Sequence, residues 1–489
     1  MRGSMTRQVD RVNGQVPRRS AREAAALIPP DATVAVSGFG GVGYPKAVPR
    51  ALAAGDRDLS LSVVSGGGVG EEIDTRLVEA GAVERRYPFQ ADRTMREAVN
   101  SGRVAFHDVH VSRMGDETVL EQLFSIDVAV VEAVAVGRDW LIPSTSIGPT
   151  PAYVAAADEL IVEVNRAQPL ALGQMHDVYR RSPPPRRGSI PLSYPGERIG
   201  TERIEFDPGA LAAVVESDSR DSPYEFREPT GKDEAIAANL AAFLADEVER
   251  NRFLRDRLCL QFGVGSLGNA VIRALRETAF PERDVVYFGE VIQDGLLDLL
   301  AEGVVDVASA TSLALSDAGQ DRLFDNVESY ADRTVLRPVD VSNNPDLVSR
   351  FGVVGVNSAV DVDVYGHVNS THIGGTRLVN GIGGSGDFAR NAMISVVALP
   401  SVTSGGDVSR IVPFARHVDH TEHDVDILIT EHGIADLRGR SPRERAAAVV
   451  EQCADPAFGP ALESYLQRAG EGDGHVGHDF ETAFDWQDG

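Results

Sequence analysis

The stretch FGVGSLGNAVIRAL (residues 262–275) decides the fold, because an earlier stretch, FGGVGYPKAVPRAL (residues 39–52), aligns with it without gaps. The two share Phe and Gly at the start and the pattern AVxRAL at the end. Each follows an apolar, strand-like run, LCLQ or TVAVSG, and each continues into a helical pattern. Both therefore indicate a strand, a glycine-rich turn and a helix, and the chain is expected to contain two similar halves.

The rest of each half alternates apolar runs with helical patterns. The second half contains LCLQFG, DVVYFG, VDVASA, VVGVNSAVDVDVYG, MISVVALPS and VDILITE, with helical patterns such as LGNAVIRAL and PRERAAAVVEQ between or after them. In the first half, LSVVSG and DVAVVEAVAV are further strand candidates. This alternation is typical of a mostly parallel sheet covered by helices on both faces. We therefore predict an α/β fold class with two similar open α/β domains.

The boundary between the halves is expected in SDSRDSPYEFREPTGKDE (217–234), a polar, Pro-bearing stretch before the helical pattern IAANLAAFLADEVER. We place the two domains at residues 1–222 and 223–489. The Arg- and Pro-rich segment at 180–200 is not expected to form regular structure. The last marked helix should begin after Ser441, with Pro442 at its first position and Glu444 completing a capping box.

The composition describes a globular, acidic protein. Its 489 residues are 43% hydrophobic, and 73 acidic against 47 basic residues give a net charge of −26. This charge argues against a nucleic-acid or anionic-membrane partner. Only Lys46 and Lys232 are lysines. Adaptation to high salt, where ions screen self-repulsion, and GC-rich coding, which favours arginine, both remain open explanations.

The sequence predicts a cytoplasmic protein. The N-terminus lacks the apolar core of a signal peptide, and no stretch reaches the apolar length that spans a bilayer. MRGS before Met5 has the appearance of a vector-derived leader. The two cysteines, Cys259 and Cys453, cannot form a disulfide framework, and Cys259 lies in an apolar run typical of the core.

Glu290 is the first candidate for chemistry. In YFGEVIQDGLLDLL (287–300) it lies where an apolar strand gives way to a helical pattern. In open α/β sheets ligands bind at that edge, where apolar surroundings can partly desolvate a carboxylate. The alternative is a solvated loop acid, which is common between a strand and a helix.

The glycine-rich turns GVGSLG (263–268) and NGIGGSGDF (380–388) expose backbone amides that suit a phosphate or a narrow ligand arm. GVGSLG lacks the acidic residue expected of a dinucleotide-binding fingerprint. We interpret Asp387 as a turn former rather than a catalyst. No GxSxG elbow is present and neither cysteine has a convincing partner, which leaves carboxylates as candidate nucleophiles.

The segment HVDHTEHD (417–424) offers an alternative. Its imidazoles and carboxylates, at His417, His420 and His423 among acidic residues, are ligand types for zinc or another divalent metal. On a helix the three histidines would spread around the axis, and the segment abuts a strand. A hydrogen-bonded structural turn is the favoured interpretation, and we predict no metal.

Several longer stretches carry a family resemblance. GEVIQDGLLDLL, VNSTHIGGTRLVNGIGGSGDFARNA, IVPFARHVDHTEHDVDILITEHGIADLRGRSPRERA and, in the first half, LIPSTSIG closely resemble the acetyl-CoA hydrolase/transferase family, particularly its succinyl-CoA:acetate CoA-transferase branch. The resemblance covers nearly the whole chain. It implies a class I CoA-transferase with two α/β domains of similar fold.

The resemblance also implies roles for individual residues. Glu290 would be the nucleophile, and Asn343 and the backbone of Gly384 would stabilise the oxyanion. Coenzyme A would be a substrate rather than a permanently bound cofactor, and a short-chain carboxylate would be its co-substrate. The residues expected to line the CoA pocket are Gly263, Gly265, Ser266, Leu267, Gly268, Asn269, Asn380, Gly384 and Glu431. Ser404 occupies a place where a lysine near the CoA phosphates is expected, and Arg410 is the candidate to compensate.

Three hypotheses for function follow. The first is a CoA-transferase that moves CoA between short-chain acids through a thioester on Glu290, and the second is an acyl-CoA hydrolase that releases the same intermediate to water. The third is a non-catalytic acyl-CoA-binding protein, against which the glutamate argues. We also expect a homodimer.

Overall fold

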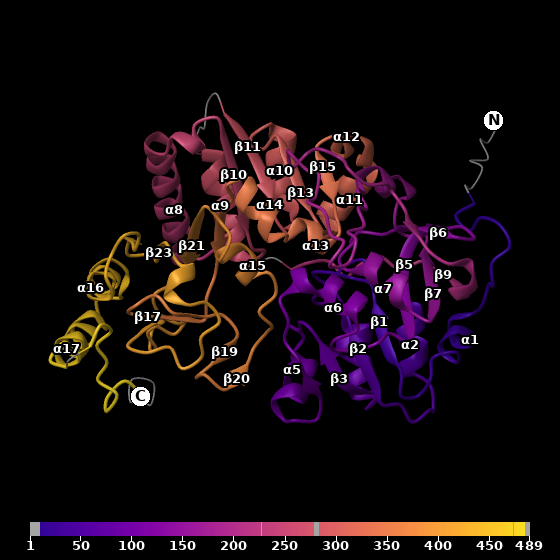
Figure 1. Ribbon diagram of the computed structural model, residues 1–489, viewed down its shortest axis with the longest axis horizontal. Coiled ribbons are helices and arrows are strands. Elements are labelled where there is room, and N and C mark those ends of the chain that lie inside the picture. Colours follow the sequence, from indigo (N-terminus) through magenta and orange to yellow (C-terminus); the bar gives the residue numbers. More distant parts are fainter. Residues whose placement is uncertain (1–9, 226, 278–282, 473, 485–489) are drawn as a thin grey trace.

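The computed structural model describes residues 10–225, 227–277, 283–472 and 474–484. The proposed MRGS leader lies outside these residues. Figure 1 shows two bodies with a sheet each, one from the indigo to magenta first half and one from the later part of the chain. Within the described residues, no helix combines the length and the apolar character that a bilayer crossing requires.

The first sheet has nine strands within the described residues, and its parallel part follows the order β4-β3-β2-β1-β5-β7-β9. Strands β6 and β8 extend it by antiparallel pairing beside β5. The bounds are β1 Thr33–Val36, β2 Leu61–Val64, β3 Val83–Tyr87, β4 Ala105–Phe106, β5 Val128–Val136, β6 Trp140–Pro143, β7 Glu159–Asn165, β8 Ile204–Glu205 and β9 Leu211–Ser217.

The second sheet has eight strands within the described residues, in the order β15-β13-β11-β10-β16-β21-β23-β24, and only β24 is antiparallel. Their bounds are β10 Arg257–Phe262, β11 Asp284–Phe288, β13 Val307–Ala310, β15 Thr334–Leu336, β16 Val354–Asn357, β21 Ile394–Ala398, β23 Ile427–Ile429 and β24 Ile434–Asp436. Short strands form small sheets beside it: β12 Val291–Ile292, β14 Ser312–Leu313, β17 Asp361–Asp363, β18 Val368–Asn369, β19 His372–Ile373, β20 Arg377–Leu378 and β22 Ile411–Val412.

The two sheets have the same topology, which confirms the fold class predicted from the repeated stretch. In each, the first strand of the half, β1 or β10, lies centrally, the next three pair outward on one side, and the later strands pair outward on the other. The order reverses at β1/β5 and at β10/β16, and ligands of open α/β sheets bind at such switch points. The parallel strands read as continuous apolar runs because helices cover both faces.

The helices of the first half are mostly short: α1 Ala21–Ala25, α2 Ala47–Ala53, α3 Glu71–Asp74, α4 Arg76–Glu79, α5 Arg93–Asn100, α6 Met114–Leu120 and α7 Thr150–Ala156. Those of the second half are α8 Gly231–Arg250, α9 Ser266–Glu277, α10 Asp294–Glu302, α11 Asp317–Asp325, α12 Val327–Ala331, α13 Val339–Ser342, α14 Pro345–Arg350, α15 Ser385–Ala389, α16 Pro442–Cys453 and α17 Gly459–Ala469. The predicted capping box of Ser441 and Glu444 at α16 is confirmed.

One apolar cluster runs through both halves. It includes Ala129 and Val131 of β5 together with Leu258 and Leu260 of β10, all at most 2% exposed. Cys259, buried in β10, belongs to a neighbouring cluster, as its apolar run predicts. Because burial of apolar surface is the main favourable term in folding, this shared core holds the two halves together.

The segments expected to be irregular are irregular. Residues 180–200 form neither helix nor strand, and the first sheet ends at Ser217 while α8 begins at Gly231. A domain boundary at 222/223 falls in this connection and remains our proposal. In Figure 1, α5 of the first half lies beside β20 of the second, and Asn100 bonds the backbone of Leu378 in both directions.

Candidate active site

Glu290 lies two residues beyond β11, at the carboxyl edge of the second sheet. Its carbonyl accepts the backbone N–H groups of Thr311 at 2.9 Å and Ser312 at 3.1 Å. The buried Tyr287 hydroxyl lies 3.0 Å from the Val291 carbonyl and so ties down the other side of the turn. The backbone of Glu290 is thus held by hydrogen bonds from Thr311, which follows β13, and from Ser312, which begins β14.

Asn343 holds the carboxylate of Glu290. It caps the C-terminus of α13 and is fully buried. The Ser342 hydroxyl donates to Asn343 Oδ1 at 3.0 Å, so the amide presents its Nδ2 donor to Glu290 Oε1 at 2.8 Å. A donor placed by a neighbouring hydrogen bond is preorganised for charge on the glutamyl group.

Gly384 packs directly against this pair. It forms the N-cap of α15 at the end of the NGIGG turn. A Cβ at this position would overlap Glu290 Oε1 and the Asn343 amide nitrogen, so only glycine fits there. No hydrogen bond from the Gly384 N–H to a described backbone carbonyl is present. The structure therefore brings together the three residues predicted to carry the chemistry.

Asp387 belongs to the same site, although the sequence suggested only a turn. Its Oδ2 accepts Asn343 Nδ2 at 3.3 Å, and its Oδ1 accepts the Ser112 hydroxyl at 2.6 Å. Burial raises the pKa of Glu290 to about 7; the Asn343 hydrogen bond opposes this shift, and the charge of Asp387 adds to it. Glu290 is therefore not a freely solvated loop acid.

One wall of the site comes from the first half of the chain. Asp108 Oδ2 accepts the Ile382 N–H at 2.8 Å, and the Val111 N–H donates to the Gly383 carbonyl at 3.1 Å. Together with the hydrogen bond of Ser112 to Asp387, these contacts hold the glycine-rich turn 380–388 against the first half of the chain. Burial raises the pKa of Asp108 to about 7.

A cavity of about 930 Å³ lies beside this wall, and Asp108 and Ile382 are among the residues that line it. Residues of both halves line it, among them His107, Asp108, His110, His372 and His417. None of the predicted catalytic or CoA-binding residues lines it. Its size alone therefore does not identify it as the catalytic pocket.

The glycine-rich turn 263–268, which we predicted to contact CoA, directly follows the carboxyl end of the central strand β10. Gly263 and Gly265 have open space where a Cβ would be, and Gly265 has a φ of +116°, which favours glycine. Helix α9 begins at Ser266 and continues through Leu267, Gly268 and Asn269. The Gly265 N–H lies 3.4 Å from Gln293 Oε1, and Gln293 follows Glu290 by three residues, so this turn lies beside the nucleophile loop.

Glu431 and Asn380 are not in contact with the Glu290 pair in the described part of the chain. Glu431 accepts the backbone and hydroxyl of Ser401 at 2.7 and 2.9 Å, and Lys232 lies 3.3 Å away. Asn380 has a buried Oδ1 that accepts no hydrogen bond from the described residues. Lys232 is a residue that sequence reasoning missed: it pairs with Glu431, which also bonds Ser401, three residues before Ser404, where we expected a lysine.

The histidines of 417–424 do not converge. His417 lies 3.1 Å from Asp419, His420 Nε2 lies 3.1 Å from the Ser385 hydroxyl, and His423 is 82% exposed beside Glu422. Instead of a helix carrying all three, the segment contains a short 3₁₀ turn, Glu422–Asp424, with a capping box. The described residues contain a different triad, Glu431, His432 and Asp455, with donor atoms within 4.8 Å of one another, but Lys232 already pairs with Glu431 there.

Comparison with known proteins identifies the class. The family model of the acetyl-CoA hydrolase/transferase N-terminal domain matches residues 5–216, and that of the C-terminal domain matches residues 319–466. The chain is 41% identical to a succinyl-CoA:acetate CoA-transferase of Clostridium kluyveri, over 96% of this chain and 88% of that one. It is 38% identical to a propanoyl-CoA:succinate CoA transferase of Escherichia coli (96% of each) and 39% identical to an acetyl-CoA hydrolase of Eremothecium gossypii (92% and 89%).

Solved structures show the same fold. RipA from Yersinia pestis superimposes with a TM-score of 0.70 at 21% identity, covering 92% of this chain and 96% of RipA. A 4-hydroxybutyrate CoA-transferase from Porphyromonas gingivalis gives 0.64 at 22% identity, covering 94% and 97%.

The chain therefore belongs to the acetyl-CoA hydrolase/transferase family. This confirms the resemblance noted in the sequence, and with it the prediction that the protein is an enzyme of this family. The roles of single residues, the homodimer and the cytoplasmic location stay predictions.

Proposed function

We propose that this enzyme transfers CoA between short-chain carboxylic acids through a covalent glutamyl-CoA thioester on Glu290. The observation that carries the proposal is the Glu290 carboxylate, held at 2.8 Å by the Asn343 amide and packed against Gly384 beside the glycine turn of β10. The succinyl-CoA:acetate and propanoyl-CoA:succinate enzymes among the relatives support this substrate class.

In the first step a Glu290 carboxylate oxygen attacks the thioester carbonyl carbon of the acyl-CoA. The carbon–sulfur bond breaks, CoA leaves as a thiolate, and an acyl-glutamyl anhydride remains. The thiolate then attacks the glutamyl carbonyl carbon, which releases the donor acid as a carboxylate and leaves the glutamyl-CoA thioester. A second carboxylate runs both steps in reverse and restores free Glu290. No proton has to move at the nucleophile, so this cycle needs no histidine base.

The surroundings of Glu290 suit this cycle. Negative charge develops on carbonyl oxygens in each step, and in this proposal the Asn343 amide, which donates to Glu290 Oε1, and the Gly384 N–H stabilise that charge. The raised pKa of Glu290, caused mainly by burial, makes its carboxylate more basic than an exposed one. In this proposal the glycine turn of β10, with Gly263, Gly265 and the start of α9, receives part of CoA.

An acyl-CoA hydrolase is the second candidate, because relatives of nearly equal similarity are named acetyl-CoA hydrolases. It would use the same Glu290 intermediate and release it to water instead of an acid. Free CoA release from acetyl-CoA or succinyl-CoA, measured with and without added acetate, separates the two. A transferase gives slow CoA release and acetate-dependent exchange, whereas rapid release independent of acetate would favour the hydrolase.

A further inference from the structure

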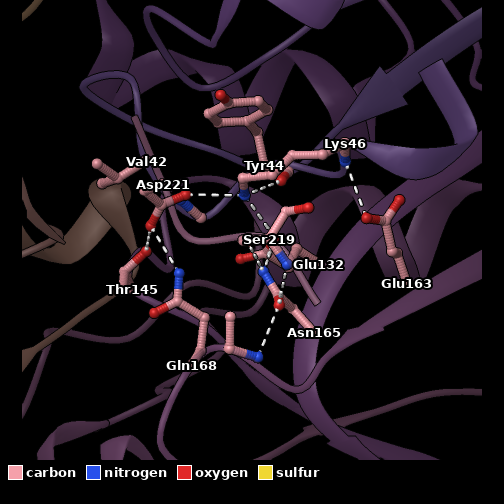
Figure 2. Close-up of polar contacts among 12 residues, drawn as sticks. Val42, Tyr44, Lys46, Glu132, Thr145, Glu163, Asn165, Gln168, Ser219 and Asp221 are labelled. Carbon is pink, nitrogen blue, oxygen red and sulfur yellow. Dashed lines mark hydrogen bonds and ion pairs between the residues drawn. The ribbon is translucent and has the colours of Figure 1, made fainter. Parts of the chain in front are cut away.

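A fully buried lysine lies in the first half, away from the Glu290 pair. Lys46 is 1% exposed, and its ammonium nitrogen lies 2.6 Å from Glu132 Oε2, 2.8 Å from Asp221 Oδ1 and 2.9 Å from the Tyr44 carbonyl. Figure 2 shows these residues converging from separate segments. Burial alone would lower the pKa of Lys46, but the two carboxylates outweigh it and raise the pKa, so the ammonium stays charged.

The residue type suits this place. Almost every basic residue of the chain is an arginine, and Lys46 is one of only two lysines. A compact ammonium can serve three acceptors that surround a point, whereas a planar guanidinium carries its donors in a rigid fork. The buried site is therefore shaped for lysine.

Asp221 connects this cluster to the segment Thr145–Gly148. One of its oxygens accepts the Gly43 N–H at 3.0 Å. The other accepts the Thr145 hydroxyl and Gln168 Nε2, the latter at 3.1 Å (Figure 2). Hydrogen bonds to a charged acceptor are stronger than neutral ones. Thr145 is thus anchored at its side chain by a charged, buried network.

The same segment then crosses to the second half. The Thr145 carbonyl accepts the Leu313 N–H at 3.0 Å, the Ile147 N–H donates to the Thr311 carbonyl at 2.9 Å, and the Gly148 N–H donates to the Thr311 hydroxyl at 2.9 Å. Thr311 in turn donates its backbone N–H to the Glu290 carbonyl at 2.9 Å. Two hydrogen bonds therefore separate the segment from the backbone of the nucleophile.

The segment also reaches the partner of the nucleophile. The Val339 N–H donates to the Gly148 carbonyl at 3.0 Å, and Val339 is the first residue of α13, whose C-cap is Asn343. A short helix that carries a donor at one end is bonded to the segment at its other end. Glu290, through Thr311, and Asn343, through α13, are therefore both linked by hydrogen bonds to the segment Thr145–Gly148.

We propose that the buried Lys46–Glu132–Asp221 cluster acts through Thr145 as a positioning element that sets the alignment of Glu290 with Asn343. This inference rests on the proposed function of Glu290. Lys46 and Asp221 are buried, and in this proposal they do not touch substrate. Their role is to hold Thr145–Gly148 against Thr311 and Val339, so that the nucleophile and its amide donor keep their mutual geometry during attack.

The variant Thr145→Val tests this link with little change of shape, because it removes the hydroxyl that reaches Asp221 and leaves Lys46 with both carboxylates. A displacement of about 1 Å at a nucleophile costs on the order of 10²-fold, so a partial loss of alignment should lower kcat by at least ~10-fold. The KM for acyl-CoA should stay within ~2-fold, because the glycine turn of β10 is unchanged. Thr145→Ser, which restores a hydroxyl, should recover most of kcat.

Thr118→Val is the matched control. Thr118 is as buried as Thr145, but the one hydrogen bond of its hydroxyl to a described residue goes to the Met114 carbonyl in its own helix. Acyl-CoA exchange and single-turnover formation of glutamyl-CoA are measured for each variant, with the melting temperature to confirm folding. A folded Thr145→Val enzyme whose kcat matches that of Thr118→Val, or whose defect is confined to KM, overturns the positioning role.

Glutamyl-CoA formation by the wild-type enzyme distinguishes failure of the proposed function from failure of the positioning proposal. If wild-type enzyme forms no glutamyl-CoA, the proposed function of Glu290 fails, and the positioning proposal that rests on it fails as well. If wild-type enzyme forms it and Thr145→Val forms it equally fast, only the positioning proposal fails. Slow formation in Thr145→Val with recovery in Thr145→Ser supports both.

Discussion

Replacing Gly384 by alanine is the substitution whose effect can be worked most directly from the geometry. The added methyl carbon would lie well inside contact distance of both Glu290 Oε1 and the Asn343 amide nitrogen. Both atoms belong to the pair that the mechanism needs aligned. The interior around them is close-packed, so the methyl group can be accommodated only if that pair moves.

The size of the effect follows from the required movement. Ordinary contacts between nonbonded heavy atoms are about 3.5–4.0 Å, so the carboxylate or the amide must retreat by on the order of 1 Å or more. A misplacement of that size costs about 10²-fold in rate, which corresponds to about 2.7 kcal/mol of transition-state stabilisation. Gly384→Ala should therefore lose at least ~10²-fold in kcat.

The assay is acyl exchange between succinyl-CoA and acetate at saturating substrates, with the melting temperature recorded in parallel. Gly459→Ala is the control, because a Cβ at Gly459 meets open space and the residue lies at the start of α17, outside the proposed site. This control should exchange at the wild-type rate. A folded Gly384→Ala enzyme that also exchanges at the wild-type rate would refute the close packing of Gly384 against the nucleophile.

Four further predictions concern Glu290 and the neighbouring Asp387. Glu290→Asp keeps the charge but shortens the arm, and it should lose at least ~10²-fold in kcat with CoA binding largely retained; near-wild-type turnover would show that Glu290 is not the nucleophile. Because the reactive form is the carboxylate and the Glu290 pKa is about 7, kcat/KM should fall as the pH drops through 7. Asp387→Asn removes a charge that helps to raise this pKa, so the fall should move to lower pH, and an unmoved profile counts against the coupling. Glu290→Gln should raise the melting temperature at pH 8 but not at pH 4. The folded pKa lies above the ordinary 4.5, so the ionised form destabilises the fold fully above pH 7 and not at all below 4.5. A melting-temperature gain of equal size at both pH values would contradict this.

The fold could be predicted because its largest pattern is local and repeated. The stretches 39–52 and 262–275 each encode a central strand end, a turn and a helix, and the parallel strands read as apolar runs because they are buried on both faces. Strand β17 lies inside the predicted run VVGVNSAVDVDVYG, but β18 to β20 and β22 escaped prediction. Each of these four strands is two residues long, too short to show a periodic pattern.

The site could be predicted only in part. The position of Glu290 followed from the strand that precedes it, whereas Asn343 and Gly384 came from the family resemblance alone. The bond of Ser112 to Asp387 joins residues 275 positions apart, in different halves, and no local pattern announces it. The approach of Lys232 to Glu431 likewise depends on how α8 packs against the second sheet.

The mass of the peptide that contains Glu290 shows directly whether this residue carries CoA during turnover. Enzyme is incubated with acyl-CoA, treated with borohydride and digested, and the Glu290 peptide is sequenced by mass spectrometry. Because borohydride reduces a thioester and leaves a carboxylate intact, the account predicts that the side chain of Glu290 is recovered as a primary alcohol. An unmodified Glu290 peptide from enzyme that is turning over acyl-CoA would contradict it.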